Sequence, residues 1–355
     1  MKHTVGIIIF SHRVDNDGYL SAALMNEFFP YYIKAKYAQE HMYELYSDDI
    51  HIKNVPWTYG DKNPDINIIK RYDYCLVLDI HFDNEMTLAL KKHFGDKFIW
   101  IEHHALPIFE YCAYCSSLNE DNFVNGIQSV KQQCNNSYIN SAAELCWYFL
   151  FGCQGTDRFG KYDGIFKDIY HRCIDDYKKY KDIPRLVKLV SDYDVWNFPN
   201  SDEWNNATYP FQMGSKMAIK NYKDMQIWFH RNEKYIDELI DAGKIIIKYE
   251  TAECLKDIRI GKIERTFEFN NRTYKACIIN TTKRTSSVFM NMPERDEYDV
   301  FICYNMIENN DNTLQYRYSM YAFKDNVNCA GMIINGLKFN GHNHATGAQS
   351  DKFIF

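Results

Sequence analysis

Residues 4–24 read TVGIIIFSHRVDNDGYLSAAL and combine a strand pattern with a cluster of polar side chains. The first seven residues are mostly apolar and rich in β-branched side chains, which predicts a short buried strand. Residues 20–29 are small and apolar at first and predict a helix. In α/β proteins, ligands bind in the loops that follow the carboxyl ends of parallel strands. The loop inside this stretch is therefore the first place to look for a site.

That loop is rich in groups that bind cations. His12, Asp15 and Asp17 come within six residues, and Gly18 follows at once. Carboxylates packed this closely repel one another, and a bound cation offsets the repulsion. The alternative is an Asx-rich turn whose acidic side chains are solvated. On these residues alone, both hypotheses explain the pattern.

Two later segments repeat the arrangement. Residues 72–78 predict a second buried strand, which ends on Asp79. Residues 97–101 predict a third strand, and the triplet EHH follows it at 102–104. Parallel strands bring their carboxyl ends to one edge of the sheet, so these polar side chains are expected to converge. Core packing does not explain such groups at three strand ends, and the sequence therefore favours a metal site.

The motifs resemble those of the DHH phosphoesterases, a family named for an Asp-His-His triplet that EHH matches here. A glycine-histidine signature in the family's C-terminal domain resembles NGHNHATG at 340–347. The motifs follow the family's order and together cover roughly residues 1–110, 183–200 and 254–355. Ahead of the signature, the matching residues are His12, Asp15, Asp17 and Gly18 in the first motif, Asp79 in the second, His103 and His104 in the third, and Asp192 in the fourth.

The resemblance implies a centre with two cations that share Asp79. The implied ligands are His12, Asp15 and Asp79 for one ion and Asp17, Asp79, His103 and Asp192 for the other. His104 would contact the scissile phosphate or the leaving group, so Asp79 and His104 are the expected catalytic residues. Asp194 is expected to orient the backbone or a neighbour. Because imidazoles and carboxylates together suit Mn²⁺, we expect two Mn²⁺ ions, with Mg²⁺ or Co²⁺ as substitutes.

The resemblance also implies that the C-terminal loop binds substrate. A glycine lets the backbone approach a phosphate, and an imidazole can donate a hydrogen bond to it. Arg317 is a candidate for an anion-binding arginine, and Tyr321 competes for that place. The alternative for the loop is a tight turn with two surface imidazoles. The loop residues expected to bind substrate are Gly341, His342, His344 and Gly347.

Three features depart from the family pattern. Asp15 follows His12 by three residues, where some family members have four and others two. Glu102 stands where the family has the aspartate of its triplet, and Asn340 replaces a glycine of the signature. The triplet's first residue usually supports the ligands from behind, so the extra methylene of Glu102 is either absorbed or tilts His103. None of these departures removes an inferred ligand.

The length of 355 residues and a hydrophobic content of 46% predict two domains with sizeable cores. We expect an α/β fold in which a mostly parallel, doubly wound N-terminal sheet has helices on both faces, followed by a smaller α/β domain with a mixed sheet. The expected boundaries are 1–205 for a metal-binding catalytic domain, 206–253 for a helical linker and 254–355 for a substrate-binding domain. Residues 327–337 are expected to begin as a helix.

The formal charge of −6 argues against a general nucleic-acid binder, which would normally carry a basic surface. The 11 cysteines are scattered, and the chain begins with a strand pattern and not with a signal peptide. No apolar run approaches the roughly 20 residues that cross a bilayer. These features predict a cytoplasmic protein with reduced thiols and no membrane partner.

The resemblance implies a metal-dependent phosphodiesterase that uses a metal-activated hydroxide. The expected substrates are short oligonucleotides, linear or cyclic dinucleotides, or a nucleotide 3′-phosphate. Long duplex nucleic acid is not expected, and a homodimer is compatible with the sequence. The alternatives are a pyrophosphate or polyphosphate phosphohydrolase and a catalytically silent nucleotide-sensing module.

Overall fold

The computed structural model describes residues 4–41, 45–103, 140–152, 165, 182–199, 201–282, 286–308 and 312–355. The chain divides into two compact units, Met1–Lys244 and Ile245–Phe355. The expected architecture is confirmed: a parallel sheet with helices is followed by a unit with a mixed sheet. Within the described residues, no helix has both the length and the apolar character that a bilayer span requires.

The N-terminal sheet has four parallel strands in the order β2-β1-β3-β4. Its register places Ser11 opposite Leu78, and Leu78 opposite Ile101, so three strands end at the same level. The polar residues that follow these strands therefore lie along one edge. The strands are β1 Val5–His12, β2 Ile50–Trp57, β3 Tyr74–Leu78 and β4 Phe98–Ile101.

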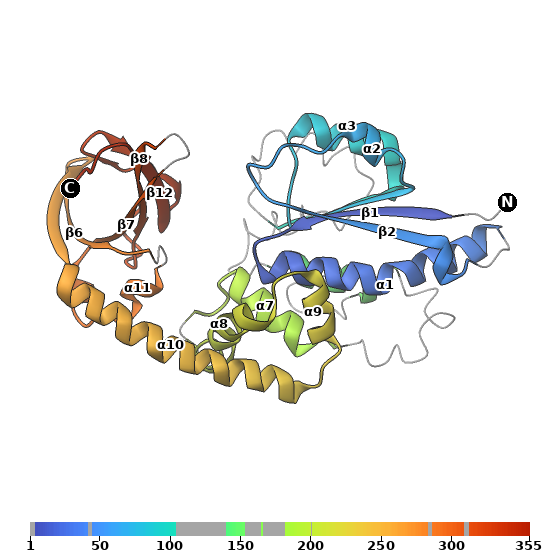
Figure 1. Ribbon diagram of the computed structural model, residues 1–355, viewed down its shortest axis with the longest axis horizontal. Helices are drawn as coiled ribbons and strands as arrows, with labels where there is room; N and C mark the ends of the chain where they lie inside the picture. The colour runs from blue at the N-terminus through green and yellow to red at the C-terminus, as the bar shows by residue number, and fades with distance from the viewer. Residues whose placement is uncertain are drawn as a thin grey trace. The chain divides into compact units, whose positions relative to one another are not determined.

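Helices cover both faces of this sheet (Figure 1). The strands are apolar at successive residues, so Ile7 and Leu76 pack into one core and Ile8 and Val77 into the other. The first core includes α1 Asn16–His41 and α6 Ala142–Phe151, and the second includes α2 Ile66–Ile69 and α3 Asn84–Phe94. Helix α1 runs well beyond the predicted end at residue 29 and contains Pro30.

Between α6 and β5, the described residues form four more helices and a π-helical turn. The boundary between the two units falls inside the last and longest of them, α10. The segment 206–253, expected to be a helical linker, is helical in α8, α9 and most of α10. The elements are α7 Arg185–Asp194, the π-helical turn Trp204–Thr208, α8 Tyr209–Ala218, α9 Tyr222–Phe229 and α10 Glu233–Gly261.

The C-terminal unit contains a six-stranded mixed sheet in the order β11-β12-β8-β7-β6-β5, in which the β6–β7 pair is parallel. The predicted hairpin near residue 270 is formed by β5 and β6. The short helix α11 Ser287–Met290 lies between β6 and β7. The strands are β5 Ile263–Phe269, β6 Arg272–Asn280, β7 Val300–Glu308, β8 Leu314–Tyr321, β11 Asn340–His342 and β12 Ala345–Ser350.

The helix predicted at the start of 327–337 is wrong. The segment consists of turns and two very short strands, β9 Ile333–Ile334 and β10 Leu337–Lys338. Asn335 and Gly336 both have positive φ angles, which a right-handed helix cannot contain. The apolar residues that imitate a helix here are buried because the turns fold them into the core of the sheet.

Candidate metal centre

The loop after β1 is shaped by a close approach of backbone to backbone. A Cβ atom on Gly18 would lie 2.3 Å from the carbonyl oxygen of His12, so any larger residue would push the end of β1 away from α1. Asp15 caps α1, because its Oδ1 accepts a hydrogen bond from the Gly18 amide at 2.9 Å. Asn16 fixes the loop to α8 by donating to Gln212 and to Ser215, each at 2.7 Å.

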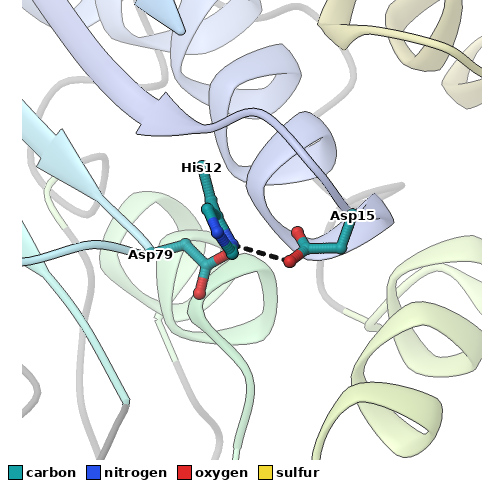
Figure 2. A group of neighbouring side chains, drawn as sticks. All are labelled: His12, Asp15 and Asp79. Atoms are coloured by element: carbon teal, nitrogen blue, oxygen red, sulfur yellow. Dashed lines mark ion pairs between the residues drawn. The ribbon is translucent and has the colours of Figure 1, made fainter. Parts of the chain in front are cut away.

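The first ligand group is formed by His12, Asp15 and Asp79. His12 lies between the two carboxylates, as Figure 2 shows, with Nδ1 2.6 Å from Asp15 Oδ2 and 3.5 Å from Asp79 Oδ2. Its other ring nitrogen, Nε2, is 3.2 Å from the hydroxyl of Thr58. Burial by itself would lower the pKa of His12, but the hydrogen bonds and charges of Asp15 and Asp79 outweigh it and raise that pKa to about 10.

The second ligand group is formed by Asp17, Asp79 and His103. His103 Nε2 lies 3.2 Å from Asp79 Oδ1 and 3.6 Å from Asp17 Oδ2. Within each group, one donor atom per residue lies within 4.8 Å of the others. Asp79 belongs to both groups, so the structure brings together five of the six residues expected to bind metal.

Asp79 is held in an uncommon backbone conformation. Its φ angle is 58°, in the left-handed region that residues other than glycine seldom occupy. Its amide donates to the carbonyl of Ile101 at 2.9 Å, which ties the ends of β3 and β4 together. Burial and the neighbouring Asp17 charge raise the pKa of Asp79. Strain and crowded charge at one residue are typical of a functional site.

Asp17 also makes a structural contact with α6 that the sequence does not reveal. Its two carboxylate oxygens accept hydrogen bonds from the amides of Ala142 and Ala143, both at 2.8 Å. These amides begin α6, so Asp17 caps a helix 125 residues further along the chain. The partial positive charge at that helix end stabilises the carboxylate next to Asp79. Spacing along the sequence contains no signal of this contact.

At the fourth motif, Asp194, rather than Asp192, reaches the cluster. Asp194 Oδ2 lies 3.1 Å from His103 Nε2. Asp192 accepts a hydrogen bond from Asn197 at 3.0 Å, and its other oxygen lies 3.5 Å from Lys188 Nζ. Asp194, expected to orient the backbone or a neighbour, thus lies against His103, while Asp192, expected to bind metal, contacts Asn197 and Lys188. Both stand in the last turn of α7, where a step of two residues moves a side chain to another face.

The triplet at 102–104 lies at the edge of the described chain. Burial would lower the pKa of His103, but the charges of Asp194, Asp17 and Glu102 raise it. Glu102 is fully buried, and its Oε1 accepts a hydrogen bond from the His103 amide at 2.7 Å. His104, expected to contact the phosphate, lies outside the described residues.

In the C-terminal unit, the register places Arg317 opposite Gln349, and Gly347 opposite Ser319. Because side chains alternate along a strand, these four positions share one face of the sheet. Arg317 Nε is buried and has no hydrogen-bond partner among the described residues.

The hairpin formed by β11 and β12 contains the remaining residues expected to bind substrate. His344 is exposed in this turn, and the backbone of His342 pairs with that of Ala345. Gly341 has a φ angle of 146°, and a Cβ atom there would lie 2.6 Å from the carbonyl of Ala345. The hairpin itself therefore requires this glycine, whether or not a phosphate binds.

The N-terminal cluster could hold metal ions. Its donor set contains imidazole nitrogens and carboxylate oxygens, the combination that suits Mn²⁺ and related first-row cations. Asp17 and Asp79 are each 1% exposed, and like charges buried together are costly unless a cation compensates them. The residues present thus fit one or two divalent cations.

Comparisons with known proteins found two solved structures with a distant similarity. No family model matches the chain, and no curated protein matches it. A crystal structure of an exopolyphosphatase-related protein from Bacteroides fragilis is similar at 13% identity and a TM-score of 0.40, over 99% of this chain and 87% of that chain. An uncharacterized protein from Helicobacter pylori G27 is similar at 12% identity and a TM-score of 0.30, over 98% and 94% of the two chains. At these values neither similarity carries an argument about fold or function.

Proposed function

We propose that this chain is a metal-dependent phosphoesterase that hydrolyses phosphodiester bonds in short nucleotides. The observation that supports it best is the pair of ligand groups sharing Asp79, which is buried at a strand end with a left-handed backbone. The order of the motifs, which resembles that of the DHH phosphoesterases, supports the same conclusion.

The residues at this centre have distinct proposed roles. When bound, two divalent cations supply an activated water and neutralise charge on the phosphoryl oxygens. His12 and Asp15 would hold one cation together with Asp79. His103, Asp17 and Asp194 would hold the other, also together with Asp79. The contacts of Asp17 with α6, and of His12 with Thr58, hold these side chains in place before any ion arrives.

The C-terminal sheet is proposed to bind anionic groups of the substrate. Arg317 supplies a positive charge on the same face of the sheet as Gly347, which belongs to the glycine-histidine motif at 340–347. An arginine with a buried and unpartnered Nε is suited to hold an anionic group such as a phosphate. A net charge of −6 favours a small substrate over a long polyanion.

A product analysis tests the proposal. The full chain is incubated with Mn²⁺ and a panel of di- to pentanucleotides, cyclic dinucleotides, adenosine 3′,5′-bisphosphate, pyrophosphate and polyphosphate. We expect mononucleotides or a released 3′-phosphate from the nucleotide substrates. Turnover of pyrophosphate or polyphosphate alone would establish the phosphohydrolase alternative, and binding of nucleotides without turnover would establish a sensor.

Asp79→Asn is the matched variant for this assay. The substitution keeps the shape of the side chain and tolerates the left-handed backbone, but it removes the charge shared by both ligand groups. Asp241→Asn, at a side chain that is 73% exposed on α10, is the control. The proposal requires turnover to depend on added metal and to disappear in the first variant alone.

A further inference from the structure

Tyr59 touches residues from all four strand ends at the candidate metal centre. It lies in the loop after β2, and its ring packs edge-on against His12 at 5.8 Å and Trp57 at 5.6 Å between ring centroids. Its hydroxyl accepts a hydrogen bond from the amide of His81, just after β3, at 3.3 Å. The same hydroxyl donates to Glu102 Oε2, just after β4, at 3.2 Å.

Glu102 is engaged at both carboxylate oxygens. While Oε2 accepts from Tyr59, Oε1 accepts from the amide of His103 at 2.7 Å. An aspartate is shorter by one methylene, so it would not reach both partners from the same backbone position. The glutamate that departs from the family's triplet is thus matched to the tyrosine across the sheet edge.

We propose that Tyr59 is a positioning residue that holds Glu102, and through it His103, in the geometry that metal binding needs. The inference rests on the proposed function, because it assumes that His103 is a metal ligand. It assigns to this chain a supporting contact that links the loop after β2 to the end of β4. Outer partners of this kind orient ligands and tune their affinity for metal.

A role as an ordinary surface aromatic does not account for these contacts. The side chain is 42% exposed, yet its hydroxyl is shared between a backbone amide and a fully buried carboxylate. Burial and the charge of Glu102 raise the pKa of the Tyr59 hydroxyl, so it remains a hydrogen-bond donor throughout the neutral range.

The test is calorimetric titration of Mn²⁺ into the full chain and into Tyr59→Phe, which keeps the ring and removes the hydroxyl. We expect about tenfold weaker Mn²⁺ binding in the variant. The control is Tyr249→Phe, at a tyrosine that is 66% exposed on α10, which should bind as the wild type does. Thermal melting of the metal-free proteins separates a binding effect from loss of the fold.

Repeating the titration in the Glu102→Asp variant tests whether Tyr59 acts through Glu102. In Glu102→Asp, affinity should already be about tenfold lower, and adding Tyr59→Phe should then change it little. If Tyr59→Phe fails to fold, Glu102→Asp alone must show the tenfold loss. Equal losses from Tyr59→Phe in both backgrounds, or unchanged Mn²⁺ affinity in either single variant, would overturn the inference. A wild-type chain that binds no Mn²⁺ would instead overturn the proposed function and the inference together.

Discussion

At the ends of β1, β3 and β4 the polar side chains are buried against one another, whereas His344 lies in the exposed turn between β11 and β12. Asp79 is 1% exposed and His103 is 7% exposed, while His344 and Gly347 are open to solvent. Burying charged groups together costs several kcal/mol per ion unless they are compensated. Exposed turn residues carry no such cost.

The contrast shows how much a motif explains in each region. In the N-terminal unit, packing alone gives no reason for Asp79 to adopt a φ angle of 58° beside Asp17 and His103, so function is the better explanation. In the hairpin, the conformation of Gly341 follows from its pairing with β12. A motif of polar residues is therefore stronger evidence for a functional site where its side chains are buried than where they are exposed.

The largest effect is expected from Asp79→Asn. Because Asp79 belongs to both ligand groups, the variant should lose Mn²⁺ affinity by more than about 100-fold and lose turnover entirely. The metal-free variant should melt no lower than wild type, since the repulsion from Asp17 is relieved. Calorimetric titration and thermal melting measure both quantities. Wild-type affinity in this variant would place the metal centre elsewhere.

The next largest effect on Mn²⁺ affinity should distinguish the two aspartates of α7. Asp194→Asn should weaken Mn²⁺ binding about tenfold, because Asp194 lies against His103. Asp192→Asn should change binding little, since Asp192 is engaged by Asn197 and Lys188. The two variants are matched in chemistry and lie two residues apart. The reverse order of effects would return the ligand role to Asp192.

A variant of the C-terminal sheet tests the expected role of Arg317. Arg317→Gln should raise KM for a nucleotide substrate about tenfold, because a charge-assisted hydrogen bond is worth roughly 1.5–3 kcal/mol. Mn²⁺ affinity should stay unchanged. Arg265→Gln, at an exposed arginine on β5 of the same sheet, is the control. An unchanged KM for every substrate that is turned over would remove Arg317 from the binding surface.

The last prediction concerns how metal binding depends on pH. In the metal-free protein His12 has a pKa of about 10, above its ordinary 6.5, so it is protonated at pH 7. A metal binds only the neutral imidazole, so binding should release a proton, and affinity should rise by up to about tenfold per pH unit between pH 7 and 9. Titrations in buffers of different ionisation enthalpy count the protons. Affinity that falls over this range would contradict the assignment of His12.

Periodicity predicts much of the fold, because it depends on local pattern. The apolar runs before His12, Asp79 and Glu102 form parallel strands, and their register aligns the polar ends as expected. The segment 327–337 shows the limit of such patterns. Its apolar residues are buried by turns at Gly331 and Asn335, and their spacing resembles that of a helix only by chance.

Contacts between distant residues could not be predicted from one sequence. The capping of α6 by Asp17 spans 125 residues, and the contact of Tyr59 with Glu102 spans 43. The choice between Asp192 and Asp194 depends on how α7 is rotated against the sheet, which spacing does not determine. These details come from packing among several elements.

The most direct test is anomalous X-ray scattering from crystals of the full chain soaked in Mn²⁺. We expect two anomalous peaks near the Asp79 carboxylate, one next to His12 and Asp15 and the other next to His103 and Asp17. Crystals that show no peak at Asp79, while Mn²⁺ binds elsewhere on the chain, would contradict this expectation.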